Sequence, residues 1–235
     1  QKTSFSGLTA SGALQTSSLN YTGDLKIKRN AYSLYGGFVD TGVAAPNYVY
    51  TGVNVAATAT NARDNKALID YTARVAADYF ARQGMAEYAF NGSVLLSKKL
   101  GDGFTASFTT ELYLAYLDYS IGGTASNNMV LFHPKIQYQY KDLIAHAGIK
   151  PVIGRGNSSY FLPDLYISYK FPAAAVAFFG GWDGSLRQNT FQQLAEYNPY
   201  LQAGYLINQT QQEELYGGLK VGIANNFTFT GKVGH

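Results

Sequence analysis

The chain has 235 residues, which is enough for one large domain or one barrel. It contains no cysteine, and this excludes a disulfide framework and thiolate chemistry. Only 14% of the residues are charged, against about 25% in an ordinary soluble domain. The net charge of +3 is too small to indicate nucleic-acid binding. The 20 Tyr, 14 Phe and 25 Gly are typical of strands that meet lipid and end at a headgroup interface.

Strand-like segments follow one another along the whole chain, and no run approaches the ~18 apolar residues of a membrane helix. We predict thirteen strands, at residues 3–15, 19–28, 31–40, 48–59, 68–82, 86–97, 104–119, 128–140, 143–153, 159–171, 174–182, 211–222 and 227–234. Most are much longer than the ~5–6 residues of an average strand in soluble proteins. A tilted strand that crosses a membrane needs about 9–11 residues, so the lengths favour membrane strands.

A two-residue alternation separates charged from apolar side chains within these segments. In residues 69–82 the even positions include Asp70, Arg74, Asp78 and Arg82, whereas the odd positions are apolar or aromatic. Successive side chains of a strand point to opposite faces, so each strand has one polar and one apolar face. This pattern fits a soluble antiparallel sheet that buries its apolar face, and it also fits a membrane barrel with a wet lumen.

The connections between segments favour the barrel. Short turns at 29–30, 98–103, 141–142, 172–173 and 223–226 alternate with longer loops at 41–47, 120–127, 154–158 and 183–210. Residues 61–67 and 83–85 depart from this alternation. Outer-membrane barrels have short turns at one end and long loops at the other. We therefore expect an all-β fold, an antiparallel up-and-down transmembrane β-barrel, as a single domain over residues 1–235 with its longest outer loop at 183–210.

The C-terminal half resembles a known class of barrel. The stretches LPDLYISYK (162–170), FGGWDGSLRQNT (179–190), EYNPYL (196–201) and EELYGGLK (213–220) carry this resemblance. They are similar to the barrel region of Bacteroidota outer-membrane proteins of the TonB-dependent-receptor-like type, over residue 135 to the end. The resemblance implies a receptor or transporter of the outer membrane. The sequence departs from this class in showing no plug domain and no energy-coupling box, and in ending without a terminal aromatic residue.

An odd strand count is a further departure, because bacterial single-chain barrels have even numbers of strands. We therefore expect the 12–14 visible strands to be part of a larger, incomplete barrel.

Charged residues on the polar faces are the candidate lumen residues: Asp70, Arg74, Asp78, Arg82, Glu87, Glu111, Lys135 and Lys150. Charges inside a barrel either pair with one another across strands, with Glu87 and Glu111 as partners of the 70–82 series, or form a selectivity filter. The candidate outer-loop binding residues are Trp182, Arg187, Tyr197 and Tyr200, because binding residues concentrate on long loops. Such a loop suits a glycan or a protein partner, and it equally suits a packed loop that closes the mouth.

Catalytic and metal-binding patterns are weak. His133 and His146 fall on polar faces near Lys135 and Lys150, whose charges disfavour a metal ion, so we expect two solvated lumen imidazoles. No GxSxG nucleophile motif occurs in the sequence. We therefore expect no cofactor, no metal and no enzymatic activity.

Three functions remain open at this point. The first is a receptor or channel that binds or passes a small solute across the outer membrane, with lipid as its surroundings. The second is a scaffold subunit of a larger complex with other outer-membrane or surface lipoprotein subunits, and without nucleic acid. The third is a membrane enzyme with a reactive triad at the barrel rim.

Overall fold

The computed structural model describes residues 2–15, 19–33, 47–61, 68–82, 84–119, 123–171, 175–198, 208–223 and 227–235. Thirteen strands account for most of them. They are β1 (Lys2–Gln15), β2 (Leu19–Ser33), β3 (Asn47–Asn61), β4 (Ile69–Arg82), β5 (Met85–Gly101), β6 (Phe104–Tyr119), β7 (Gly123–Ser126), β8 (Met129–Tyr140), β9 (Leu143–Ile153), β10 (Ser159–Phe171), β11 (Val176–Arg187), β12 (Thr210–Ile223) and β13 (Phe227–Gly234). A short 3-10 turn, η1 (Arg155–Asn157), and one helix, α1 (Phe191–Tyr197), complete the described elements.

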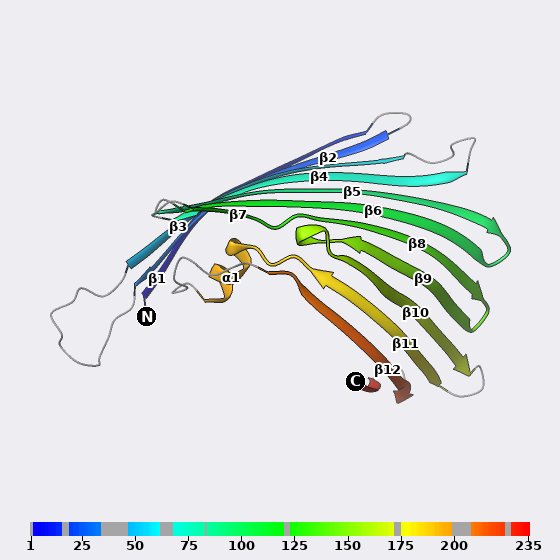
Figure 1. Ribbon diagram of the computed structural model, residues 1–235. Coiled ribbons are helices and arrows are strands. Elements are labelled where there is room, and N and C mark those ends of the chain that lie inside the picture. The colour runs from blue at the N-terminus through cyan, green and yellow to red at the C-terminus, as the bar shows by residue number, and fades with distance from the viewer. Residues whose placement is uncertain are drawn as a thin grey trace, which may run out of the picture.

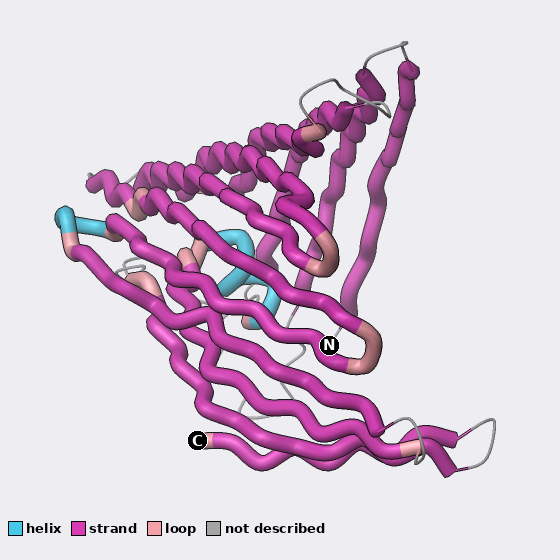
Figure 2. The backbone as a smooth tube through the Cα atoms, turned by 90° about the vertical axis from the view of Figure 1, so that its right-hand side faces the viewer, coloured by secondary structure: helices cyan, strands magenta, loops and turns pink. Residues whose placement is uncertain are grey.

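The strands form one antiparallel up-and-down sheet. Each strand pairs with its neighbours in the chain, except that β6 pairs with both β8 and the short β7. β1 and β13 are the two edges, and no pairing between them occurs among the described residues. Figures 1 and 2 show the sheet as a deeply curved trough with α1 on its concave side. The expected all-β, up-and-down antiparallel architecture is confirmed, and the described sheet is open at its two edges.

Several predicted segments differ from the observed strands. β5 runs to Gly101, so only residues 102–103 of the predicted turn at 98–103 connect β5 to β6. The predicted turn at residues 29–30 is wrong, because Asn30 lies inside β2 and pairs with Phe5 on one side and Tyr50 on the other. Pairing on both sides outweighs the local turn preference of asparagine. The predicted loop at 120–127 contains β7, and β11 extends to Arg187, so the loop predicted from residue 183 begins after 187. Residues 34–40 of the predicted third strand lie outside the described residues.

The apolar side chains lie on the exposed convex face of the sheet. Val75, Ile136 and Ile167 are 48%, 53% and 55% exposed, whereas Phe80 and Glu87 on the concave face are 6% and 2% exposed. A soluble sandwich would bury the apolar set and leave the polar set in water. The observed sheet does the reverse, which is the arrangement of a barrel whose outer face meets lipid. In the described part of the chain, no helix is long and apolar enough to cross a membrane.

The two ends of the sheet differ in their connections. At one end, called the loop end here, lie the connections 83–84, 120–128, 154–158 and 188–209. At the other, called the turn end, lie the short connections 102–103, 141–142, 172–175 and 224–226. The predicted alternation of short and long connections is therefore present, with 83–84 as the one short connection among those named at the loop end. The longest of them, 188–209, carries α1 into the trough (Figure 2).

Candidate functional site

The helix α1 is docked by an aromatic cluster on the concave face near the loop end. Phe191 is 2% exposed and belongs to a buried cluster with Tyr50, Phe80, Met85 and Leu117. Its ring centroid lies 5.7 Å from that of Phe80 and 6.4 Å from that of Tyr50. These rings lie on the polar side of their strands, where they form a small apolar floor for the helix. The first residue of α1 is therefore held in place by packing.

A buried carboxylate holds the start of the same helix. Glu87 on β5 is 2% exposed, and its two oxygens accept hydrogen bonds from the backbone N–H groups of Phe191 and Gln192. The hydroxyl oxygen of Thr190 accepts a third from the backbone N–H of Gln193, at 3.2 Å. The first N–H groups of a helix have no partner within the helix, and a negative charge there is stabilising. Glu87 therefore fastens α1 to the sheet from 104 residues away in the chain.

Amide side chains fasten the remaining described part of the 188–209 connection. Asn127 donates to the carbonyl oxygen of Asn189 at 2.9 Å, and Gln188 donates to that of Asn127. Gln209 donates to the carbonyl oxygen of Asn128 at 3.0 Å and accepts from the backbone N–H of Arg155 at 3.1 Å. The connection is thus tied to the β6–β8 and β9–β10 connections.

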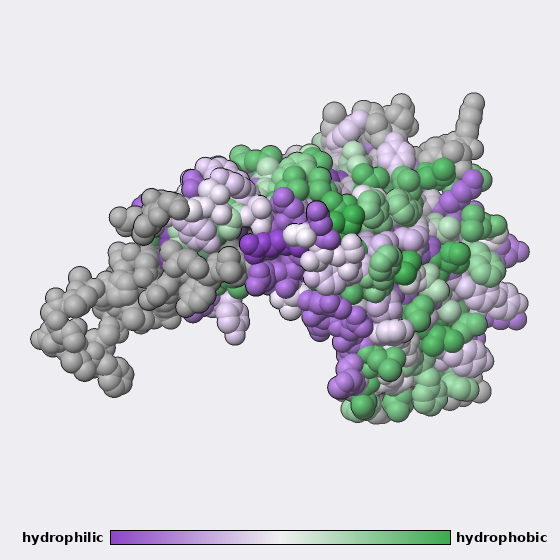
Figure 3. Space-filling view, viewed as in Figure 1, coloured by the Kyte–Doolittle hydropathy of each residue, from purple (hydrophilic) through white to green (hydrophobic). Residues whose placement is uncertain are grey.

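Two cavities lie beside α1 on the concave face. The larger has a volume of about 500 Å³ and the smaller about 270 Å³. The larger is lined by Asp78, Glu87, Ala89, Asn91, Glu111, Tyr113, Met129, Leu131, Leu186, Arg187, Gln188, Thr190, Gln192 and Gln193. The smaller is lined by Lys26, Lys28, Asn30, Tyr50, Gly52, Val53, Asn54, Asp78, Phe80, Gln192 and Glu196. Figure 3 shows hydrophilic side chains gathered around α1, with hydrophobic side chains spread over the strands.

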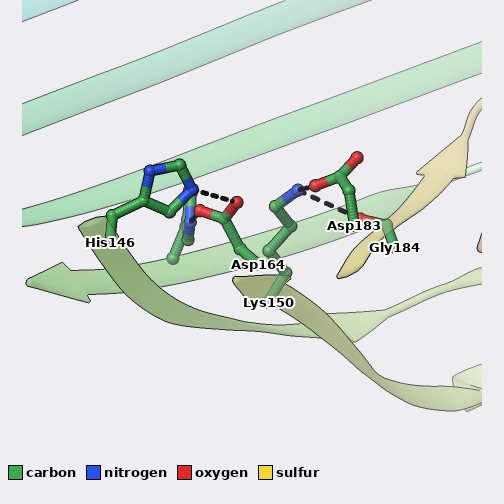
Figure 4. A network of polar contacts seen from close by, with 6 residues as sticks. His146, Lys150, Asp164, Asp183 and Gly184 are labelled. Carbon is green, nitrogen blue, oxygen red and sulfur yellow. Dashed lines mark hydrogen bonds and ion pairs between the residues drawn. The ribbon is translucent and has the colours of Figure 1, made fainter. Parts of the chain in front are cut away.

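A second polar centre crosses β8, β9 and β10. Nε2 of His133 lies 2.6 Å from Oδ2 of Asp164, and Nε2 of His146 lies 3.0 Å from Oδ1 of the same carboxylate (Figure 4). An ionised carboxylate only accepts hydrogen bonds, so both rings donate from Nε2. Gly148 makes room for this arrangement, because a Cβ there would lie 3.1 Å from Nε2 of His133. Beside it, Nζ of Lys150 lies 2.6 Å from Oδ1 of Asp183.

The expectation of solvated imidazoles is wrong for both histidines. The side chains of His133 and His146 are only 16% and 22% exposed, and both bind the 11% exposed side chain of Asp164. The strand register is the reason, since it places Asp164 level with Gly148 and Lys135 and puts the two histidines two residues to either side of that row, on the same concave face. Among the described residues, no group of three or more His, Cys, Asp or Glu side chains has an arrangement that could hold a metal ion.

Some of the other predicted lumen charges lie around α1 and its cavities, and the rest lie elsewhere on the polar faces of their strands. Asp78, Glu87 and Glu111 come together around the larger cavity, where Asp78 accepts from Asn54 at 2.7 Å and Glu111 accepts from Tyr113 at 2.6 Å. Arg82 donates to the Tyr50 hydroxyl at 3.2 Å and lies over the Phe191 ring. Asp70 accepts from Asn61 at 3.2 Å, away from the cavities, while Arg74 and Lys135 sit on the polar faces of β4 and β8. The four ion pairs found among the described residues join none of the 70–82 series to Glu87 or Glu111.

The predicted outer-loop residues lie in three different places. Trp182 is not in a loop, because it belongs to β11 and pairs with Leu165 and Leu215 on the convex face, 44% exposed. Arg187 ends β11 and lines the larger cavity. Tyr197 ends α1 and is 92% exposed. Tyr200 lies outside the described residues.

Two further site residues, Phe80 and Asp164, carry a signal in the sequence itself. Phe80 occupies a position on the polar face of β4, where an aromatic side chain breaks the pattern. Asp164 likewise sits on the polar face of β10. The partnership of Glu87 with α1 left no signal, because nothing in a linear sequence joins residue 87 to residue 191.

Removal of the shared carboxylate tests the histidine centre. We expect Asp164→Asn to lower the free energy of unfolding by about 1–3 kcal/mol, because its amide accepts from one imidazole and leaves the other donor without a partner. Urea titration of the folded, heat-modifiable gel band of the full-length protein measures this change. Glu214→Gln breaks the exposed pair with Lys232 and should cost under about 1 kcal/mol. Equal effects of the two substitutions would contradict a structural role for Asp164.

Comparisons with known proteins support the fold of this chain. No family model matches the chain, and no curated protein matches it. Four solved chains match its structure, and among them is the crystal structure of the siderophore receptor PirA from Pseudomonas aeruginosa. The match covers 98% of this chain and 51% of the receptor chain, with a TM-score of 0.64 and 11% sequence identity. The chain therefore shares the barrel architecture of this receptor and spans about half of its length.

Proposed function

We propose that this protein is a non-enzymatic, integral outer-membrane β-barrel protein that binds or passes a small solute. The docking of α1 inside the trough carries the proposal, because it places a fastened loop segment and two cavities in the path along the lumen. The apolar convex face supports a lipid environment. The likeness to a siderophore receptor supports a receptor-like role. The origin in Bacteroidota that the sequence resemblance implies stays a prediction.

The proposal is non-enzymatic because the imidazoles of His133 and His146 engage a carboxylate and not a hydroxyl nucleophile. Both His133 and His146 direct Nε2 to Asp164, and His146 also stacks on Tyr166 with ring centroids 5.4 Å apart. A hydrolytic triad requires a base within hydrogen-bond reach of its nucleophile. The contacts of this centre are those of a structural lock between strands.

A scaffold subunit is the second candidate, and the same helix supports it. A lumen filled by an inward-folded segment suits a barrel that only holds partners, such as surface lipoprotein subunits. The two candidates differ in what lies behind α1: a receptor or transporter has a path there, and a scaffold does not.

Removal of α1 distinguishes these candidates. The full-length protein and a variant with residues 191–197 replaced by a Gly/Ser linker are inserted in planar bilayers, and single-channel conductance is recorded. We expect the wild-type protein to be silent or nearly so, and the variant to give steady openings because its aromatic and carboxylate contacts are lost. Heat-modifiable gel mobility controls for insertion. A variant that inserts and stays silent would support the scaffold, and failure of both proteins to insert would overturn the barrel.

A further inference from the structure

The two cavities beside α1 adjoin, because Asp78 and Gln192 line both of them. We propose that together they bind a short, extended peptide with free termini, its ammonium end in the larger cavity and its carboxylate end in the smaller one. The inference rests on the proposed role in binding a solute and names the chemical class of that solute.

The larger cavity has the chemistry to hold an ammonium group. Three carboxylates line it, those of Asp78, Glu87 and Glu111, against one guanidinium, that of Arg187. The oxygens of Glu87 are engaged by the start of α1, and Asp78 accepts from Asn54. Tyr113 contacts one oxygen of Glu111, and a carboxylate has room for several donors. Glu111 is therefore the residue assigned to the ammonium end.

The smaller cavity has lysines at its far side, and it also holds the carboxylates of Asp78, shared with the larger cavity, and of Glu196 on α1, which accepts from Gln192 at 3.2 Å. Lys26 and Lys28 both line it from β2, and both are exposed at the surface of the trough. An ammonium on a flexible stem can reach a carboxylate in several poses. Because these two lysines lie on the side of the cavity away from Glu111, positive and negative charges are separated along the combined cavity. A ligand with one charge sign alone would meet repulsion at one end.

The distance between the two charged ends fits a few peptide units. Lys26, Asn54 and Asp78 lie in one cross-strand row, and Glu111 lies two strands further on, towards the turn end. With strands ~4.8 Å apart and ~3.3 Å per residue along a strand, Lys26 and Glu111 are separated by roughly 20 Å. An extended chain covers this in roughly five or six residues.

The middle of the combined cavity offers amide groups. Asn91, Gln192 and Gln193 line the larger cavity. A side-chain amide both donates and accepts, as a peptide unit does, so it can pair with the backbone of an extended ligand without regard to its side chains. The apolar side chains of Met129 and Leu131 line the same cavity and give side chains of the ligand an apolar surface.

Capped peptides test the charge assignment. Isothermal titration of the full-length protein in detergent uses pentaalanine with free termini, N-acetylated pentaalanine and C-amidated pentaalanine. We expect each cap to weaken binding about threefold to fivefold, the range of a partly solvated ion pair. Glu111→Gln should remove the effect of the acetyl cap only. The double variant Lys26→Gln, Lys28→Gln should remove the effect of the amide cap only, and Lys220→Gln, in a separate cavity at the turn end, should change neither.

The outcomes separate the peptide site from the proposed function. Equal affinity for all three peptides would overturn the charge assignment. No binding by a protein that inserts in bilayers and conducts after removal of α1 would overturn the peptide site and leave the transport role standing. A protein that fails to insert at all would instead overturn the proposed function on which the site depends.

Discussion

Replacement of Phe191 with alanine should release α1 from the sheet. The side chain is 2% exposed and contacts Tyr50 and Phe80, so its loss leaves a cavity between the helix and the four strands β3 to β6 that form the cluster. Truncation of a buried phenylalanine typically costs about 3–5 kcal/mol. A helix of seven residues has little stability of its own, so it depends on its contacts with the sheet. We expect the loss of the Phe191 contacts to free α1 from the sheet. Hydrogen exchange should show loss of protection at the backbone amides of residues 191–197.

The other end of the same helix provides the control. Tyr197 is also aromatic but is 92% exposed, and Tyr197→Ala should leave the protection of these amides within about 0.5 kcal/mol of wild type. Strands β4 and β5 should exchange alike in both variants, because their pairing does not depend on α1. Unchanged protection in Phe191→Ala would show that Glu87 alone holds the helix.

The faces of the strands could be predicted from the sequence because alternation is a local property. Each strand carries its own period of two, and the set Ile69, Tyr71, Val75 and Tyr79 is on the convex face of β4 as the pattern indicates. The lengths of the strands and the uneven connections came from the same local signals. Alternation could not show which face of the sheet is buried. The exposed fractions show that the apolar face is exposed and the concave face is partly buried.

The candidate site could not be predicted to the same depth, because register and loop docking are not local. Asp164 and the two histidines were each on a polar face, but only the pairing of β8, β9 and β10 places Asp164 between the rows of the two histidines. The partnership of Glu87 with Phe191 joins segments 104 residues apart through a loop whose path the sequence does not specify. Trp182 was predicted as the last residue of a strand and grouped with the loop that follows, yet pairing with β12 continues β11 to Arg187.

A charged residue on the apolar convex face should strongly destabilise the protein, and this tests whether that face contacts lipid. Val94 lies near the middle of β5, is 44% exposed and pairs with Ala73 and Thr110. A lysine on the lipid face at the bilayer midplane destabilises a barrel by about 2–4 kcal/mol. We therefore expect Val94→Lys to lower the free energy of unfolding in lipid vesicles by that amount, measured by urea titration of the full-length protein.

The adjacent residue turns this into a test of sidedness. Ser93 is on the concave face, paired with Arg74 and Glu111, so a lysine there meets water and both signs of charge. Ser93→Lys should change the folding free energy by under about 1 kcal/mol, although it introduces the same residue one position away. In a soluble sheet with a wet convex face, the two substitutions would have similar small effects. A large difference in the expected direction requires lipid on the side of Val94 and water on the side of Ser93, which is the arrangement that a lumen with a docked helix and two polar cavities needs.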